Sequence, residues 1–203
     1  MTRRLLLALA VILLCAAAPV PQPGVLKPGE AIHGRFVQER HLAGLASPLR
    51  SEGSFLLAAG RGLIWRGEKP FNTVVVITPA GILQTVNGAE VQRLAASRLP
   101  FLARFYDMLS GALSGDWSTL THEFTVTRSG EGDNWKMMLT LARADDPAAA
   151  QLKLIIVTGA KFVDAVEIRR VNGDWEHLTF LQQVLSAAPL AGDDARLFEQ
   201  AGR

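Results

Sequence analysis

Cysteine is almost absent from this chain. The single cysteine among 203 residues, Cys15, lies at the end of an N-terminal segment with the composition of a signal peptide. Once that segment is removed, the chain can form no disulfide and has no thiol to act as a nucleophile or a metal ligand. The remaining chain of roughly 185 residues is long enough for one domain with one sizeable core.

Sequence motifs of catalysis are also lacking. The chain has no Gly-x-Ser-x-Gly elbow, no His-Glu-x-x-His helix and no glycine-rich phosphate loop. The histidines are scattered without the close spacing of metal ligands: His33, His41, His122 and His177. We therefore expect a protein that is not an enzyme and that has no cofactor and no metal site. A catalytic triad assembled from distant parts of the chain stays open as an alternative.

A clustered basic patch, the usual mark of nucleic-acid binding, is missing as well. The full chain has 21 Lys+Arg and 19 Asp+Glu, a formal charge of +2. Loss of Arg3 and Arg4 with the N-terminal segment leaves 19 of each and a formal charge of 0. We expect no nucleic-acid partner.

The N-terminal segment has the parts of a secretory signal. Arg3 and Arg4 precede an unbroken apolar run over residues 5–14, and small residues follow from Cys15 to Ala18. Ten apolar residues are about half of the roughly 20 that cross a bilayer, so a membrane anchor is the weaker alternative.

These features predict a signal peptide over residues 1–17 and a single domain over residues 18–203. Two alternatives concern the processing of the segment. Cleavage after Ala18 would place Pro19 directly after the cut, and Cys15 could instead become the acylated first residue of a lipoprotein.

Short β-like segments dominate the rest of the chain. Val74 to Ile77 is β-branched throughout, and Asn87-Gly88 and Asn172-Gly173 are two-residue hairpin signals. The segments recur about every 8 to 12 residues, a spacing typical of an antiparallel sandwich or barrel. The predicted strands are 33–41, 51–58, 62–66, 73–78, 82–86, 91–94, 123–128, 135–143, 152–158, 162–171 and 175–185.

One segment, residues 100–113, has the pattern of a helix instead. Proline stands at its first position and Gly115 just past its end. Phe101, Phe105 and Met108 lie on one stripe, with leucines beside it. A stripe of this width predicts a helix that is buried on more than half of its circumference.

Apolar residues are in excess, at 49% of the chain. Residues 63–65, 74–77 and 154–157 lack the alternation of a sheet with one wet face. Either helices or a second sheet cover both sides of these strands, or a curved sheet lines an apolar cavity that the helix over residues 100–113 closes. Composition leaves both interpretations open.

Four short motifs follow one another in the first half of the chain. They are Phe36-Val-Gln38, Ser51-Glu-Gly53-Ser-Phe55, Gly62-Leu-Ile-Trp65 and Lys69-Pro70-Phe71. In this order they resemble the LolA-like periplasmic outer-membrane lipoprotein carriers, in which an F-x-Q strand precedes a G-x-hydrophobic strand, a strand ending in Trp and a proline. Later segments also fit, namely Leu99-Pro-Phe101, Asp116-Trp117, Asn172-Gly-Asp174, Leu178-Thr-Phe180 and Phe198.

The resemblance implies a mainly β (α+β) fold: an unclosed antiparallel β-barrel, or half-barrel, with a helical lid over an apolar cavity. It implies a monomeric carrier in the periplasm of a Gram-negative bacterium, which shields the acyl chains of a lipoprotein or other lipid-like molecule in transit toward the outer membrane. The implied partners are an acylated lipid or lipoprotein cargo and, transiently, an inner-membrane donor and an outer-membrane acceptor.

We expect the cavity and its lid to be formed by apolar side chains of the predicted strands and helix. They are Phe36, Phe55, Leu63, Trp65, Val74, Val76, Phe101, Phe105 and Met108. Alternation along a strand places Leu63 with Trp65, and Val74 with Val76, on common faces. An ordinary core is the alternative role for each of these residues.

The lid latch of the family has a shifted counterpart here. Family members carry an Arg-Pro pair after the second strand, whose Arg helps to hold the lid. Those positions are Ala59-Gly60 in this chain, so Arg61, two places beyond the Arg position, is the candidate latch. The family's first amphipathic helix also has no clear counterpart, because a proline-rich stretch up to Glu30 precedes the F-x-Q motif.

Two other functions stay open at this point. The same half-barrel could be a lipid-sensing regulatory module that binds a protein partner. A secreted hydrolase of lipid-linked substrates would need a nucleophile and a base that no motif indicates.

Overall fold

The computed structural model describes residues 26–98, 121, 124–131, 134–142, 151–187, 190 and 192–202. These residues form eleven strands, a short 3-10 helix and one α-helix. The strands are β1 (Ala31–His41), β2 (Leu49–Ala58), β3 (Gly62–Lys69), β4 (Thr73–Thr78), β5 (Gly81–Val86), β6 (Ala89–Ala95), β7 (Phe124–Glu131), β8 (Asn134–Leu141), β9 (Leu152–Gly159), β10 (Val163–Arg170) and β11 (Trp175–Ser186). The helices are η1 (Ala96–Arg98) and α2 (Gly192–Ala201).

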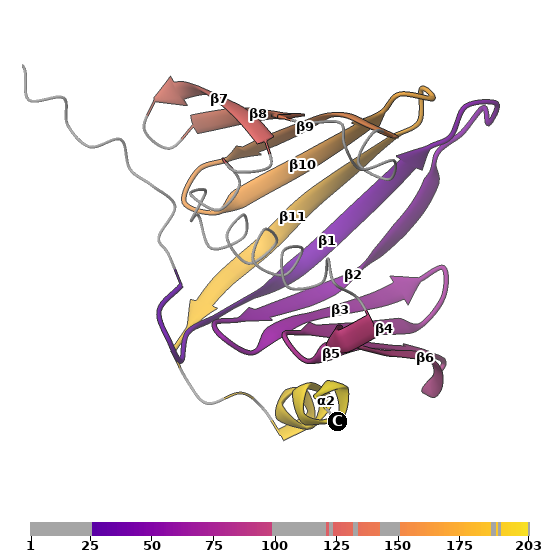
Figure 1. The fold of residues 1–203 in the computed structure, drawn as a ribbon, viewed down its shortest axis with the longest axis vertical. Helices are drawn as coiled ribbons and strands as arrows, with labels where there is room; N and C mark the ends of the chain where they lie inside the picture. The colour runs from indigo at the N-terminus through magenta and orange to yellow at the C-terminus, as the bar shows by residue number, and fades with distance from the viewer. Residues whose placement is uncertain are drawn as a thin grey trace, which may run out of the picture.

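All eleven strands belong to one antiparallel sheet, in the order β6-β5-β4-β3-β2-β1-β11-β10-β9-β8-β7 (Figure 1). Neighbours in the sheet are neighbours in sequence, except that β1 pairs with β11 along ten residue pairs. This central pairing joins an N-terminal half, β1 to β6, to a C-terminal half, β7 to β11. β6 and β7 remain the two edges, so the barrel is not closed.

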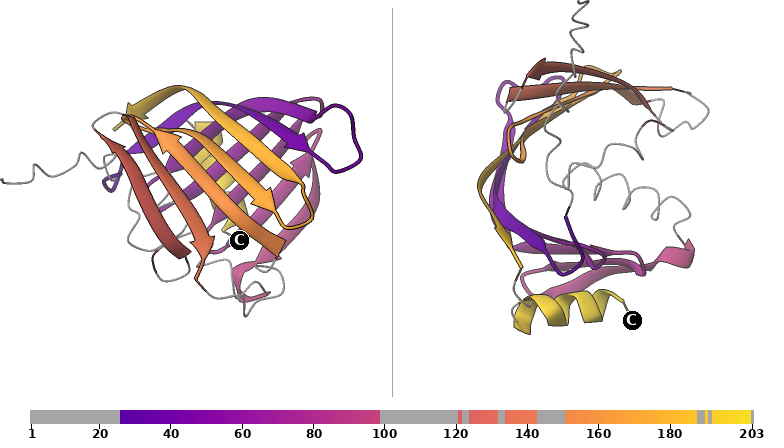
Figure 2. Two further views of the ribbon diagram at one scale, coloured as in Figure 1. Left: turned by 90° about the horizontal axis from the view of Figure 1, so that it is seen from above. Right: turned by 90° about the vertical axis from the view of Figure 1, so that its left-hand side faces the viewer.

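The sheet curls into a trough with a concave and a convex face (Figure 2). Register decides which side chains lie on each face, since successive residues of a strand point to opposite faces. Leu63 pairs with Ile77, and Ile64 pairs with Val76 in the next rung. Leu63 and Ile77 belong to the cluster of the concave face, whereas Ile64 and Val76 belong to a second cluster on the convex face.

The two predicted hairpin turns differ in the structure. Asn87 and Gly88 have φ angles of 51° and 82° and join β5 to β6 as a two-residue turn. This is the left-handed conformation that glycine and asparagine accept most readily. The expected two-residue turn at Asn172-Gly173 is wrong, because four residues, 171–174, separate β10 from β11. The Asp174 side chain accepts a hydrogen bond from the Asn172 amide group at 2.8 Å and thereby supports the longer turn.

The C-terminal helix α2 was not predicted. It lies against the convex face at β3, β4 and β5 (Figure 2). Phe198 and Ala201 are buried there, beside Ile64, Val76 and Leu83. The helix begins with Asp193 and Asp194, acidic residues that its N-terminal dipole favours.

The mainly β fold and the unclosed antiparallel barrel are confirmed. Each of the eleven predicted strands overlaps an observed strand, with ends that differ by a few residues. The helix predicted over residues 100–113 lies outside the described residues. Within the described part of the chain, no helix is long and apolar enough to span a membrane.

Candidate functional site

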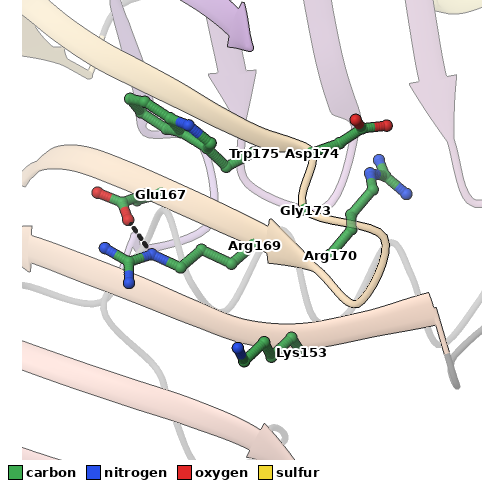
Figure 3. A pocket seen from close by; sticks show the side chains of 7 residues that line it. All are labelled: Lys153, Glu167, Arg169, Arg170, Gly173, Asp174 and Trp175. Carbon is green, nitrogen blue, oxygen red and sulfur yellow. Dashed lines mark hydrogen bonds and ion pairs between the residues drawn. The ribbon is translucent and has the colours of Figure 1, made fainter. Parts of the chain in front are cut away.

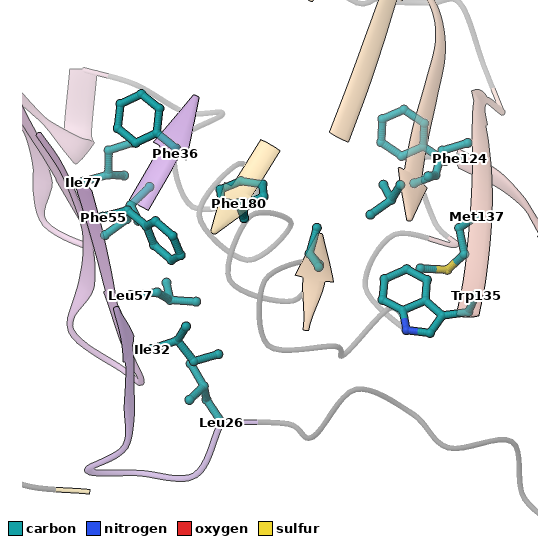
Figure 4. Packing of buried hydrophobic residues seen from close by; sticks show 14 residues of the cluster. Leu26, Ile32, Phe36, Phe55, Leu57, Ile77, Phe124, Trp135, Met137 and Phe180 are labelled. Atoms are coloured by element: carbon teal, nitrogen blue, oxygen red, sulfur yellow. The ribbon is translucent and has the colours of Figure 1, made fainter. Parts of the chain in front are cut away.

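The concave face carries one apolar cluster that extends across both halves of the sheet (Figure 4). Figure 4 shows Phe36, Phe55 and Leu57 on one wall, and Trp135 and Met137 on the other. The buried members of the cluster are Leu26, Ile32, Phe36, Phe55, Leu57, Leu63, Ile77, Phe124, Trp135, Met137, Leu139, Val157, Val163 and Phe180. With its partly buried members, the cluster lines the trough with aliphatic and aromatic side chains from β5 to β7.

Aromatic rings form the middle of this cluster. The rings of Phe36 and Trp65 stack with centroids 3.8 Å apart. Phe55 meets Phe180 edge-on at 5.3 Å, and Trp65 meets Phe180 edge-on at 6.2 Å. Offset and edge-to-face arrangements of this kind add to the free energy of apolar burial. These rings come from β1, β2, β3 and β11, and the β1–β11 pairing is what brings them together.

Four of the expected cavity residues come together on the concave face. Phe36, Phe55 and Leu63 are 1%, 2% and 4% exposed, and Trp65 packs against them. Phe36, Phe55 and Leu63 are therefore buried in this structure, and Trp65 is partly buried beside them.

Val74 and Val76 do not join this group, and their expected place in the cavity is corrected. Both belong to the convex cluster, where α2 covers them. Their neighbours Val75 and Ile77 take the concave positions instead. The reason is physical: a strand buried on both faces has apolar residues at every position, so its sequence does not indicate which parity faces inward.

The remaining expectations concern the lid. Phe101, Phe105 and Met108 lie outside the described residues. Arg61 lies in the exposed turn between β2 and β3, where its backbone N–H donates to the Ala58 carbonyl at 3.0 Å. Among the described residues, the Arg61 side chain has no ion-pair partner.

A different arginine fastens a helix to the sheet. The Arg66 guanidinium of β3 forms an ion pair of 2.5 Å with the Asp194 carboxylate in the first turn of α2. Both side chains are partly buried, with exposed fractions of 28% and 19%. This contact lies on the convex face, and sequence analysis did not single out either residue.

Polar side chains occupy one end of the concave face, and we call them the polar end cluster: Gln38, Arg40, Ser51, Arg170 and Glu176. The Glu176 carboxylate accepts a hydrogen bond from the Gln38 amide at 2.9 Å and ion pairs with Arg40 and Arg170, both at 3.2 Å. Glu176 is only 8% exposed, so its charge needs these partners. Gln38 stands in the F-x-Q motif, but no sequence signal linked it to a carboxylate 138 positions away.

Open cavities occur elsewhere and differ in character. One of about 510 Å³ lies on the convex face beside α2 and is lined in part by His33, Arg35 and Asp194. Another, of about 440 Å³, lies at the β10–β11 turn and is lined by Lys153, Glu167, Arg169, Arg170, Gly173, Asp174 and Trp175 (Figure 3). Charged side chains predominate in this second cavity, so it does not fit an acyl chain.

Ion pairs between side chains of β1, β2 and β3 shift several pKa values. On the convex face Arg35 holds both carboxylate oxygens of Glu68, at 3.1 and 2.8 Å. Hydrogen bonding from Arg35 lowers the pKa of Glu68, and hydrogen bonding from Lys69 lowers the pKa of Glu52. The Glu68 side chain is 46% exposed and that of Glu52 is 26% exposed, as is typical of structural ion pairs near the surface. No group of three or more potential metal ligands occurs among the residues that the structure describes.

An unclosed antiparallel half-barrel with an apolar concave face defines a class of binding proteins. The comparison with protein families agrees: the model of the LolA-like outer membrane lipoprotein carrier proteins matches residues 24–199. The chain belongs to this family.

Solved structures with low sequence identity match most of the chain. The Pseudomonas aeruginosa MucA/MucB complex matches at 16% identity and a TM-score of 0.40, over 81% of this chain and 54% of that chain. A LolA superfamily protein from Nitrosomonas europaea matches at 8% identity and a TM-score of 0.38, over 81% and 90%. A domain described as a putative outer membrane lipoprotein-sorting protein from Vibrio parahaemolyticus matches at 5% identity and 0.40, over 85% and 93%. No curated protein matches the chain.

Proposed function

We propose that this protein is a periplasmic carrier that shields the acyl chains of a lipoprotein or other lipid-like molecule in transit toward the outer membrane. The observation that carries the proposal is the apolar cluster over the concave face of an unclosed sheet. Acyl chains need such a surface, because each methylene group left in water costs about 0.8 kcal/mol. Membership of the carrier family supports the same function.

Loading requires a change of state. Phe36, Phe55 and Phe180 are buried in this structure, so an acyl chain reaches them only in a state that exposes them. The free energy of burying the acyl chain would then offset the cost of exposing these side chains. A carrier also has to release its load, and return of these side chains to their buried state would favour release.

The first test is direct detection of cargo. The full chain, purified from its native envelope without detergent, should carry a lipid or an acylated peptide that native mass spectrometry detects. The delipidated protein should bind the neutral fluorescent probe N-phenyl-1-naphthylamine saturably. An added acyl ligand should displace the bound probe, with one ligand molecule bound per protein. A protein that purifies empty and shows no saturable probe binding would defeat the carrier function.

Two adjacent methionines of β8 provide a matched pair of variants. Met137 is 2% exposed in the concave cluster, whereas Met138 on the opposite face is 39% exposed. Met137→Gln places a polar amide among the apolar side chains and should weaken probe binding about tenfold, as expected for about 1.4 kcal/mol of lost affinity. Met138→Gln is the same change on the other face and should leave binding unchanged. Equal effects of the two variants would place the acyl site outside the trough.

The donor and acceptor proteins remain part of the proposal. Cargo transfer from inner-membrane vesicles to outer-membrane vesicles, with and without the purified protein, measures the carrier step. A lipid-sensing regulatory module would instead bind acyl ligand and form a stable complex with one protein without moving cargo between vesicles.

A further inference from the structure

Polarity changes along the length of the concave face, and this gradient carries information about the ligand. On β1, the side chains on the concave face become more polar toward one end of the strand, in the order Ile32, Phe36, Gln38 and Arg40. The pairing strand β11 follows the same order, from Phe180 through Leu178 to Glu176. β2 follows it too, from Leu57 through Phe55 to Ser51. Three central strands thus agree on one apolar end and one polar end.

The register supports a single continuous face. β1 pairs with β2 without a shift from Ile32 to Arg40. The β1–β11 pairing has one shift, between His33 and Arg35, and none from Phe36 to Arg40. Ile32 and Arg40 are eight residues apart, about 27 Å at 3.4 Å per residue. The trough is therefore amphipathic along its axis, with a length comparable to that of an extended lipid.

Charge and exposure at the polar end differ from those of the rest of the trough. Arg40 and Arg170 with Glu176 give the polar end cluster a formal charge of +1. The side chains of Arg40 and Arg170 are 47% and 43% exposed, so solvent reaches them, whereas Ile32, Phe36 and Phe180 are 2%, 1% and 6% exposed. Each guanidinium has five N–H donors, more than its contacts with Glu176 use. A ligand anion can accept these donors without displacing Glu176.

We propose that the polar end cluster binds the anionic headgroup of an amphiphile whose acyl chain lies along the apolar trough. This inference rests on the proposed carrier function and adds the ligand's charge and its orientation. Arginine suits the task because its planar guanidinium hydrogen-bonds phosphate or carboxylate oxygens in pairs. The headgroup would lie beside the turn over residues 171–174, and the chain end would lie near Leu26 and Ile32.

The test compares two lysolipids that share one acyl chain and differ in charge. Lysophosphatidylglycerol is anionic, lysophosphatidylcholine is zwitterionic, and each displaces N-phenyl-1-naphthylamine from the full chain below its micellar concentration. We expect the anionic lysolipid to bind about fivefold more tightly than the zwitterionic one, because it gains one partly exposed ion pair. This preference should decrease at high salt, which screens exposed charges. Glycerol 3-phosphate, a headgroup without a chain, should bind at least about a hundredfold more weakly, because it buries no methylenes.

Adjacent arginines supply the matched variants. Arg170 forms an ion pair with Glu176, whereas Arg169 forms one with Glu167 (Figure 3) and is not part of the polar end cluster. Arg170→Gln should remove most of the preference, and Arg169→Gln, which changes the net charge equally, should keep it. Arg40→Gln repeats the test in case the first variant unfolds, and thermal unfolding of each variant checks the fold.

Glu176→Gln separates ligand binding from a structural role. It raises the formal charge of the polar end cluster from +1 to +2 and keeps the side chain's shape. The preference for the anionic lysolipid should therefore increase about threefold, or more at low salt. If the cluster only closes the end of the trough, Glu176→Gln lowers the preference or leaves it unchanged.

The outcomes distinguish this inference from the function on which it rests. Equal affinity for the two lysolipids, equal effects of Arg169→Gln and Arg170→Gln, or tight binding of glycerol 3-phosphate alone would overturn the headgroup site and leave the carrier function standing. Absence of saturable binding by either lysolipid and by the probe would overturn both.

Discussion

β3 and β8 bury their residues in different ways. In β3, Leu63 and Ile64 point to opposite faces and are 4% and 0% exposed, because the concave cluster covers one and α2 covers the other. In β8, burial alternates from residue to residue: Trp135, Met137 and Leu139 are buried, and the residues between them are exposed. In β3, apolar residues at successive positions thus accompany burial on both faces, whereas in β8 alternation accompanies burial on the concave face alone.

This difference bears on the two interpretations of the apolar excess. A helix does cover the far side of β3 and β4, so part of the excess is ordinary core. The concave cluster nevertheless continues to β8 and β9, where the opposite face has no comparable burial among the described residues. Of the two clusters, the concave one is the feature that both halves of the sheet share.

The largest expected effect tests the alternation in β8. Trp135 is 1% exposed, its indole N–H donates to the Ala160 carbonyl at 2.7 Å, and a Cβ added at Gly159 would lie 2.5 Å from its ring. Trp135→Ala should lower the free energy of unfolding by about 3–5 kcal/mol. Lys136→Ala, one position along and on the exposed face, should change it by less than about 0.5 kcal/mol. Chemical denaturation measures both, and similar values for the two variants would contradict the one-sided burial of β8.

The next effect tests the double cover of β3. Leu63→Ala and Ile64→Ala should each cost about 2–5 kcal/mol, since each deletes buried methyl groups beneath a different cover. A further variant, with a stop codon in place of Gly192, removes α2 and should abolish most of the Ile64 effect while leaving the Leu63 effect. The same denaturation experiment checks this, and an Ile64→Ala penalty that survives without α2 would show that the helix is not its cover.

Local sequence signals predicted the strands but not their faces. β-branched runs and turn residues such as Asn87-Gly88 act over a few positions, and this is why each predicted strand overlaps an observed one. In Val74 to Ile77 every residue is apolar, so the choice between the two parities depends on α2, which lies more than a hundred positions later. Phe36, Phe55, Leu63 and Trp65 stand in the short motifs by which the sequence resembles the carrier family. All four side chains belong to the concave cluster or pack against it.

The polar end cluster shows a second limit. Gln38 and Glu176 come together through the β1–β11 pairing, which is the one non-sequential pairing in the sheet. No periodicity within either strand indicates which distant strand it will meet. Sequence analysis could therefore predict the apolar part of the candidate site, whose chemistry repeats along each strand, but not the ion-pair partners that only the topology brings together.

The smallest expected effect lies at the exposed end of the trough, where the side chains belong neither to the concave cluster nor to the cluster beneath α2. The Asp174 carboxylate accepts a hydrogen bond from the Ala43 backbone N–H at 2.8 Å and so joins the β10–β11 turn to the β1–β2 loop. This bond, and a second one from Asn172, lower the pKa of Asp174. A carboxyl group with a lowered pKa in the folded state stabilises the fold above its unfolded pKa, about 3.9, and the contribution is lost as the pH falls through the folded pKa.

The Ala43 amide proton reports this titration. Its NMR chemical shift should change with an inflection below pH about 3.9, and Asp174→Asn should remove the inflection while leaving the fold intact. Asp164 is the internal control, because burial raises its pKa and its own signals should titrate above the same value. An Ala43 inflection at or above that of Asp164 would mean that the two loops are not joined through Asp174. The β10–β11 turn and the β1–β2 loop, beside the polar end cluster, would then lack this connection.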